Sequence, residues 1–326
     1  MTDTLSQFSV LSLYSAMAIY AIAFVLFTLD LARGAGKEAR AAAASDSVVQ
    51  ATGEGRTATL TRVEVDAATQ APGRRRLARV AMALTWLGFA FQLVAAIMRG
   101  ISASRVPWAN MYEFAMTGTL MITLVFLLVN LKWDLKFVGA FSTGFVLLLL
   151  GLAATRYYVE VVPLPPALQS PWLVIHVFVA TLSTGFFALG FALSLAQILQ
   201  SRREHRSVDG KPTRLGWMER LPDSARLENY AYRLIIVGFI FWSFTLIAGA
   251  IWADKAWGRY WGWDTKEVWT FIIWTIYAGY IHARATRGWR GTRSAVLAMV
   301  GFGAVMFNFT VVNIYFKGLH AYSGLN

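Results

Sequence analysis

Apolar residues gather into eight long segments along the chain, separated by shorter polar connections. The segments lie at about residues 9–31, 79–98, 111–131, 137–156, 172–200, 230–252, 267–285 and 294–314. A helix needs about 20 mostly apolar residues to cross a bilayer, where backbone groups must form their hydrogen bonds within the helix. The pattern therefore predicts an all-α fold, a polytopic membrane helix bundle with about eight transmembrane helices.

Composition narrows the kinds of chemistry open to this bundle. The 326 residues are 57% hydrophobic and 15% charged, which excludes an ordinary soluble domain. The net charge of +12 would normally suggest nucleic acid, but the basic residues lie between the apolar segments, so we expect no nucleic-acid partner. The absence of cysteine excludes disulfides, thiolate metal sites and cysteine nucleophiles. Metal or cofactor chemistry must use histidine, carboxylate or methionine side chains.

The distribution of Lys and Arg predicts how the bundle is oriented. The connections 33–79, 132–136, 201–233 and 284–293 hold 23 of the 30 basic residues, which leaves 7 for the other side. Cytoplasmic connections retain positive charge, so both termini are expected to be extracytoplasmic. We divide the chain into a first transmembrane helix at 1–32, a cytoplasmic disordered linker at 33–78 that lacks apolar periodicity, and a membrane domain at 79–326.

Aromatic residues are concentrated in the connection at 252–267, on the extracytoplasmic side. Trp257, Tyr260, Trp261 and Trp263 place four rings within seven positions. An interfacial aromatic belt would explain scattered tryptophans, but it explains this density poorly. Glycines allow close backbone approach, and Lys255, Arg259 and Lys266 add positive charge, so a large planar anionic ligand would suit this loop.

Carboxylates near this loop also have a structural explanation. Asp264 and Glu267 have the spacing of a capping box at the start of the seventh helix. Asn110 and Glu113 have the same spacing at the start of the third helix. Capping is at least as good an explanation of these residues as direct chemistry.

Three of the four histidines lie in or beside predicted membrane segments, where ionisable side chains suggest function. His176 lies one turn inside the fifth helix, and His320 follows the eighth, so both are expected near the tryptophan-rich loop. Two neutral imidazoles there could hold a haem iron from opposite sides. His282 lies 15 residues beyond Glu267, roughly 22 Å from the loop, and cannot share that iron. His205 lies in the Arg-rich connection at 201–233 and is expected to be a solvated surface residue.

Several segments resemble a known family. Residues 257–267 are similar to the tryptophan-rich WWD signature of the haem-handling proteins of cytochrome c biogenesis. Their continuation to residue 284 resembles the CcsA or ResC branch of system II, whose actinobacterial members are often named CcsB. Residues 107–113, 169–177 and 317–323 match further family segments in the same order. The resemblance covers most of the chain from about residue 80 onward.

This resemblance implies specific roles for the site residues. His176 and His320 would be axial ligands to the iron of haem b, carried as cargo, and His282 would belong to an inner haem site. Trp257, Trp261, Trp263 and Asp264 would belong to the loop that holds the ring, with Arg259 or Lys255 pairing with its propionates. Thr265 stands where many members have proline, which removes no ligand.

The resemblance also implies a function and partners. The chain would carry haem across the inner (plasma) membrane and present its vinyl groups to the CxxCH segment of apocytochrome c. A ResB-like membrane partner would supply the second ligand of the inner site, and a thioredoxin-like protein would act as thiol reductant. Whether the chain is an enzyme stays open, because haem lyase activity is expected only in complex with that partner.

Two other functions fit parts of the sequence. A haem or small-molecule transporter without synthetase activity would also have eight helices and an intramembrane histidine. A structural or quinone-associated subunit could use its tryptophans merely as membrane anchors. Covalent attachment of haem to a CxxCH reporter separates the first from a synthetase subunit, and the spectrum of the purified protein tests the second.

Overall fold

The chain folds into a bundle of long helices. The computed structural model describes residues 2–50, 76–161, 169–208, 216–286, 288–316 and 318–319, and it contains no strand within these ranges. The main helices are α1 (Thr2–Gln50), α2 (Arg76–Ala103), α3 (Met111–Lys132), α4 (Gly139–Arg156), α5 (Pro171–Val208), α6 (Ser224–Trp257), α7 (Thr265–Thr286) and α8 (Thr292–Phe307). Short turns of 3-10 helix precede α4 and α6, at η1 (Lys136–Val138) and η3 (Gly216–Arg220). The all-α architecture predicted from the sequence is confirmed.

Seven helices in the described part of the chain are long and apolar enough to cross a membrane, as expected of a multi-pass membrane protein. The eighth predicted span is α7, whose 22 residues are sufficient in length. It is less apolar than the others because it carries threonines, tyrosines, His282 and Arg284.

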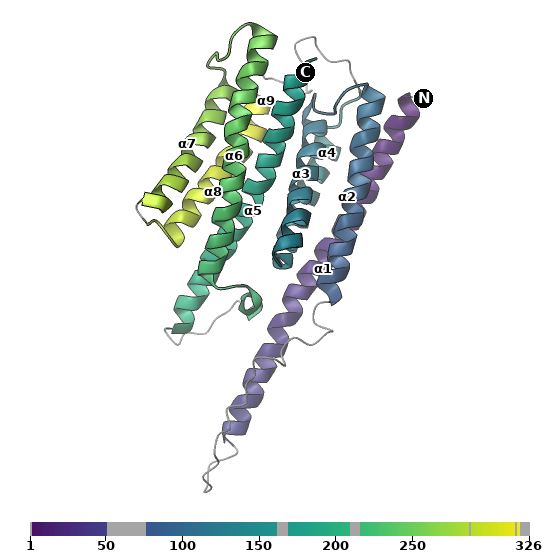
Figure 1. Cartoon of the computed structure of the whole chain (residues 1–326). Helices are drawn as coiled ribbons and strands as arrows, with labels where there is room; N and C mark the ends of the chain where they lie inside the picture. Colours follow the sequence, from purple (N-terminus) through teal and green to yellow (C-terminus); the bar gives the residue numbers. More distant parts are fainter. Residues whose placement is uncertain are drawn as a thin grey trace.

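The first helix continues past its predicted end at residue 31, as far as Gln50. It therefore includes the first part of the segment 33–78 that we expected to be a linker, while residues 51–75 lie outside the described residues. Alanine has the highest helix propensity, and the run at residues 41–44 favours this extension. Figure 1 shows this part of α1 projecting beyond the rest of the bundle.

The bundle has two sides, with α1–α4 on one and α5–α8 on the other (Figure 1). The most extensive helix contacts are those of α5 with α6 and of α1 with α2, and α3 joins the two sides by packing on α5. Small residues allow this close approach, as at Gly190, where an added Cβ would lie 2.6 Å from Ile235 Cγ1. The α5–α6 pair consequently has a tightly fixed register.

The helix that precedes the C-terminal tail changes its winding near one end. After α8, the chain forms a π-helical segment, η4 (Asn308–Val312), and a final turn, α9 (Asn313–Tyr315). Figure 1 shows α9 at the same end of the bundle as the start of α1 and the connection between α6 and α7. Single π turns often occur at functional sites, so η4 marks this end of the bundle as a candidate location for one.

Candidate functional site

A large cavity lies at this end of the bundle. Its volume is about 1030 Å³, at the upper limit of the roughly 300–1,000 Å³ usual for small-molecule sites. Its wall on α5 extends from Pro171 to Thr184, which is about 20 Å along the helix axis. The α2–α3 connection, α3, α5, α6, the α6–α7 connection, α7 and η4 all contribute residues. The cavity is therefore large enough for a cofactor-sized molecule and reaches deep into the bundle.

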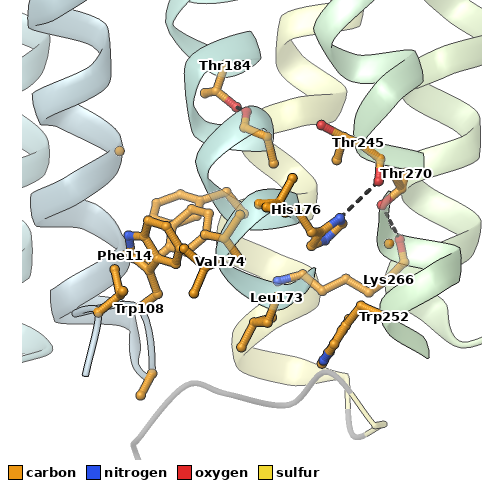
Figure 2. Close-up of a pocket in the computed structure, with 18 of the residues that line it drawn as sticks. Trp108, Phe114, Leu173, Val174, His176, Thr184, Thr245, Trp252, Lys266 and Thr270 are labelled. Carbon is orange, nitrogen blue, oxygen red and sulfur yellow. Dashed lines mark hydrogen bonds between the residues drawn. The ribbon is translucent and has the colours of Figure 1, made fainter. Parts of the chain in front are cut away.

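His176 lines this cavity from the second turn of α5. Its Nδ1 lies 2.9 Å from the carbonyl oxygen of Thr245 on α6, and the imidazole stacks on Trp252 at 6.0 Å between centroids and 21° between planes (Figure 2). A carbonyl oxygen can only accept, so Nδ1 carries the proton of the neutral ring. Nε2 then carries the lone pair, which is the tautomer that a metal ligand requires.

The place of the imidazole depends on a glycine in α6. A Cβ added at Gly249 would lie 2.7 Å from His176 Cε1 and 2.8 Å from its Nδ1. Thr245, Gly249 and Trp252 follow one another at intervals of about one helical turn. They form a socket for the ring: Thr245 accepts its hydrogen bond, Gly249 leaves room for it, and Trp252 stacks on it.

The tryptophan loop, residues 257–264, closes the cavity at the rim. Tyr260 and Trp261 line the cavity, whereas Trp257 packs edge to face on Trp252 at 4.8 Å. Trp263 is 76% exposed, meets Trp261 at 6.0 Å, and has a left-handed backbone (φ 59°) that side chains other than glycine seldom adopt. The loop thus presents one tryptophan to the cavity and holds another out from the surface.

Arg259 packs within the loop. The site of a Cβ at Gly262 is filled by the Arg259 guanidinium, so a side chain at position 262 would displace it. Neither Arg259 nor Lys255 is among the described residues that line the cavity. The cations in its wall are Arg105, from the α2–α3 connection, and Lys266, whose Nζ donates to Asn313 Oδ1 at 2.5 Å.

The expected capping box is confirmed at the start of α7, whereas the start of α3 has only its N-cap half, because the Glu113 carboxylate accepts from the Ala109 N–H. Asp264 Oδ1 accepts from the Lys266 N–H at 3.0 Å, and Glu267 Oε2 accepts from the N–H groups of Asp264 at 3.0 Å and Gly262 at 2.8 Å. Asn110 Oδ1 likewise accepts from the Glu113 N–H at 2.9 Å. These acids and amides shape the loops on either side of the cavity.

The C-terminal tail is fastened to the same loop. The Leu319 N–H donates to Asp264 Oδ2 at 2.7 Å. His320, the next residue, lies outside the described residues, so its position relative to His176 stays a prediction.

The other two histidines lie elsewhere. His282 is exposed near the end of α7, four residues before Thr286, and does not line the cavity. His205 is exposed at the end of α5, where its Nδ1 lies 2.6 Å from the Ser201 carbonyl oxygen. No cluster of three or more histidine, cysteine, aspartate or glutamate residues suited to a metal is present in the described ranges. Of the three histidines that the structure describes, His176 lines the cavity.

Comparisons with known proteins give the family. Residues 108–320 match the family model described as cytochrome C assembly protein. The chain is 34% identical over 267 residues to cytochrome c biogenesis protein CcsA of Prochlorococcus marinus, covering 76% of this chain and 84% of that protein. It is also 34% identical over 256 residues to CcsA of Trieres chinensis, covering 70% and 81%.

A solved structure shows the same fold. Cytochrome c Heme Lyase CcmF is 17% identical, with a TM-score of 0.63 over 94% of this chain. The match spans 46% of that longer protein. Taken with the family match and the relatives, the identification follows: this chain belongs to the cytochrome c assembly protein family, in its CcsA group.

Proposed function

We propose that this chain is the haem-handling membrane subunit of a system II cytochrome c synthetase. It carries haem b as cargo to the cavity beside the tryptophan loop and presents it there to apocytochrome c. The proposal depends on the position of His176 in the wall of a cavity of about 1030 Å³. The Thr245 carbonyl holds this histidine in the tautomer that has its lone pair on Nε2. Family membership and names of relatives point to the same chemistry.

His176 and His320 hold the iron in this proposal. The socket on α6 orients His176, and the bond from Leu319 to Asp264 brings the residue before His320 to the loop. The cavity wall contributes aromatic surface from Trp108, Trp252 and Trp261, against which a planar ring packs. The exposed Trp263 lies at the rim, where an approaching polypeptide would meet it.

The chain's contribution to the reaction is orientation. Addition of a cysteine S–H across a haem vinyl group forms the C–S bond, and the thiol hydrogen goes to the other vinyl carbon. The carbon–carbon double bond is consumed, and no oxidant is needed. Holding the vinyl carbons beside the thiol of a CxxCH segment makes the step effectively intramolecular, which is the rate advantage of proximity.

The remaining parts of the proposal concern topology and partners. The tryptophan loop faces the extracytoplasmic side of the inner (plasma) membrane, because the basic connections lie at the opposite end. His282, exposed on the less apolar helix α7, belongs to an inner haem site that a ResB-like partner completes. A thioredoxin-like protein keeps the apocytochrome thiols reduced.

Co-expression tests this function directly. The chain and its ResB-like partner are produced with a CxxCH reporter in a host that lacks its own cytochrome c assembly system. We expect covalent haem on the reporter, lost with His176→Ala and retained with His205→Ala, which changes an exposed histidine in the same way. Haem export without covalent attachment would instead support the transporter alternative.

A further inference from the structure

The connection between α2 and α3 forms one side of the cavity and carries several hydrogen-bond donors. Arg105, Trp108 and Asn110 all line the cavity. Figure 2 shows Trp108 on the α3 side, with His176, Trp252 and Lys266 across the cavity on the elements of the other side. This connection is thus placed to contact the far edge of any molecule bound to His176.

Asn110 has a fixed orientation and an unused donor. Its Oδ1 accepts the Glu113 N–H as the N-cap of α3, which identifies the other amide atom as Nδ2. The residue is 3% exposed, and Nδ2 is buried without a hydrogen-bond partner in the described part of the chain. A buried donor is costly unless an acceptor meets it.

Trp108, two residues earlier, also has an unused hydrogen-bond donor. Its Nε1 is also buried and has no hydrogen-bond partner within the described ranges. An indole N–H can donate but cannot accept. Both residues line the cavity, so an acceptor atom that a bound molecule brings beside them would satisfy these two donors.

Charge adds to this preference for an acceptor. Arg105 Nη1 lies 2.6 Å from Glu113 Oε2, and Arg99 Nε lies 2.9 Å from Oε1 of the same carboxylate. The side chain of Arg105 is 7% exposed, that of Arg99 is 1% exposed, and that of Glu113 is fully buried. Two guanidinium groups share one carboxylate, which gives the cluster a formal charge of +1 in a setting where water screens it little.

From these contacts we infer that Arg105, Trp108 and Asn110 form a carboxylate-binding corner of the cavity. Carboxylate oxygens only accept, and they form their strongest hydrogen bonds with charged donors. The inference rests on the proposed function, in which the carboxylate is a haem propionate. It assigns the propionate to the α2–α3 connection, whereas the sequence led us to expect Arg259 or Lys255.

Two substitutions each remove one of these donors, the Asn110 NH2 group or the Trp108 indole N–H. Asn110→Asp retains an oxygen for the helix cap, because aspartate caps as well as asparagine, and it replaces the NH2 group by an oxygen that repels a carboxylate. Trp108→Phe removes the indole N–H and keeps an aromatic ring. Asn229→Asp is the matched control, since Asn229 is exposed at the start of α6, its Oδ1 accepts from Arg284, and the change in charge is the same.

The probes are haem and haem dimethyl ester, whose propionates carry no charge, titrated into the purified full-length chain and followed by absorption. We expect Asn110→Asp to weaken haem binding about tenfold or more, the effect of a lost charge-assisted hydrogen bond, and to change binding of the diester less than about threefold. Trp108→Phe should act in the same direction. Asn229→Asp should leave both affinities unchanged.

Two results would overturn the inference, and they differ in what else they affect. Equal losses for haem and the diester in Asn110→Asp, or no loss for either, would refute carboxylate recognition while leaving the proposed function intact, provided that wild-type binding still depends on His176. Failure of the wild-type chain to bind haem would overturn the inference and the proposed function together.

Discussion

Replacing Gly249 by alanine tests the socket that holds His176. The new Cβ would lie 2.7 Å from His176 Cε1, whereas ordinary van der Waals contact begins at 3.4 Å, so the ring must retreat by about 0.7 Å, the difference between the two. A shift of that size stretches the 2.9 Å hydrogen bond to the Thr245 carbonyl and moves the Nε2 lone pair. Overpacking of this kind costs about 1–3 kcal/mol. Because ligation requires the ring in its original place, up to this cost opposes haem binding, which corresponds to a loss of affinity of about 5- to 150-fold.

Haem titration of the purified chain, followed by absorption, measures this loss. Gly279→Ala is the matched control, because a Cβ at that position meets nothing within 4 Å and alanine favours the helix. In a His176→Ala background, Gly249→Ala should have little further effect, since the ring with which it collides is gone. Full haem affinity in Gly249→Ala, or an equal loss with and without His176, would refute the assignment of this glycine to the histidine socket.

Three further predictions concern the histidines and the loop. His176→Ala and His320→Ala should each weaken haem binding, and added imidazole should partly restore it; failure of restoration in both variants would argue against coordination. His282→Ala should lower the haem loaded in cells without changing the affinity of the purified chain for added haem, and normal loading would exclude an obligatory inner relay. Glu267→Ala should lower the free energy of unfolding by about 1–2 kcal/mol, because two loop N–H groups lose their acceptor. An unchanged thermal midpoint in detergent would show that this cap stabilises little.

Much of the fold follows from the length of the apolar segments alone. All eight predicted helices are present, because a membrane helix needs a length of apolar sequence that few other structures require. The membrane-spanning part of α1 was predicted at 9–31 and is found at Thr4–Ala32, whereas the helix itself continues to Gln50 because helix propensity extends it beyond the apolar segment. Local capping was also predictable, because Asp264 and Glu267 interact across only three residues.

The socket around His176 could not be predicted in the same way. Thr245, Gly249 and Trp252 resemble ordinary residues of a membrane helix, and only the packing of α5 against α6 brings them to the imidazole. The spacing of these three residues at about one turn was the available signal, but it identifies a helix face and not its partner. Long-range packing of side chains carries the information that the sequence pattern lacks.

The cations that line the cavity could not be identified from the sequence for a related reason. Proximity in sequence to the aromatic cluster favoured Arg259 and Lys255, but Arg259 folds back over Gly262 within the loop. Arg105 lies more than 150 positions before the tryptophan loop and reaches the cavity through the connection between α2 and α3. Its position depends on the buried ion pair with Glu113, which tertiary structure creates.

A structure of the chain with its partner and bound haem would test the central claim most directly, because the iron position alone identifies the ligands. We predict iron within bonding distance of His176 Nε2, a second imidazole from His320 on the opposite face, and the porphyrin inside the cavity beneath Trp261. Haem bound only beside His282, or a porphyrin outside the cavity, would contradict the account.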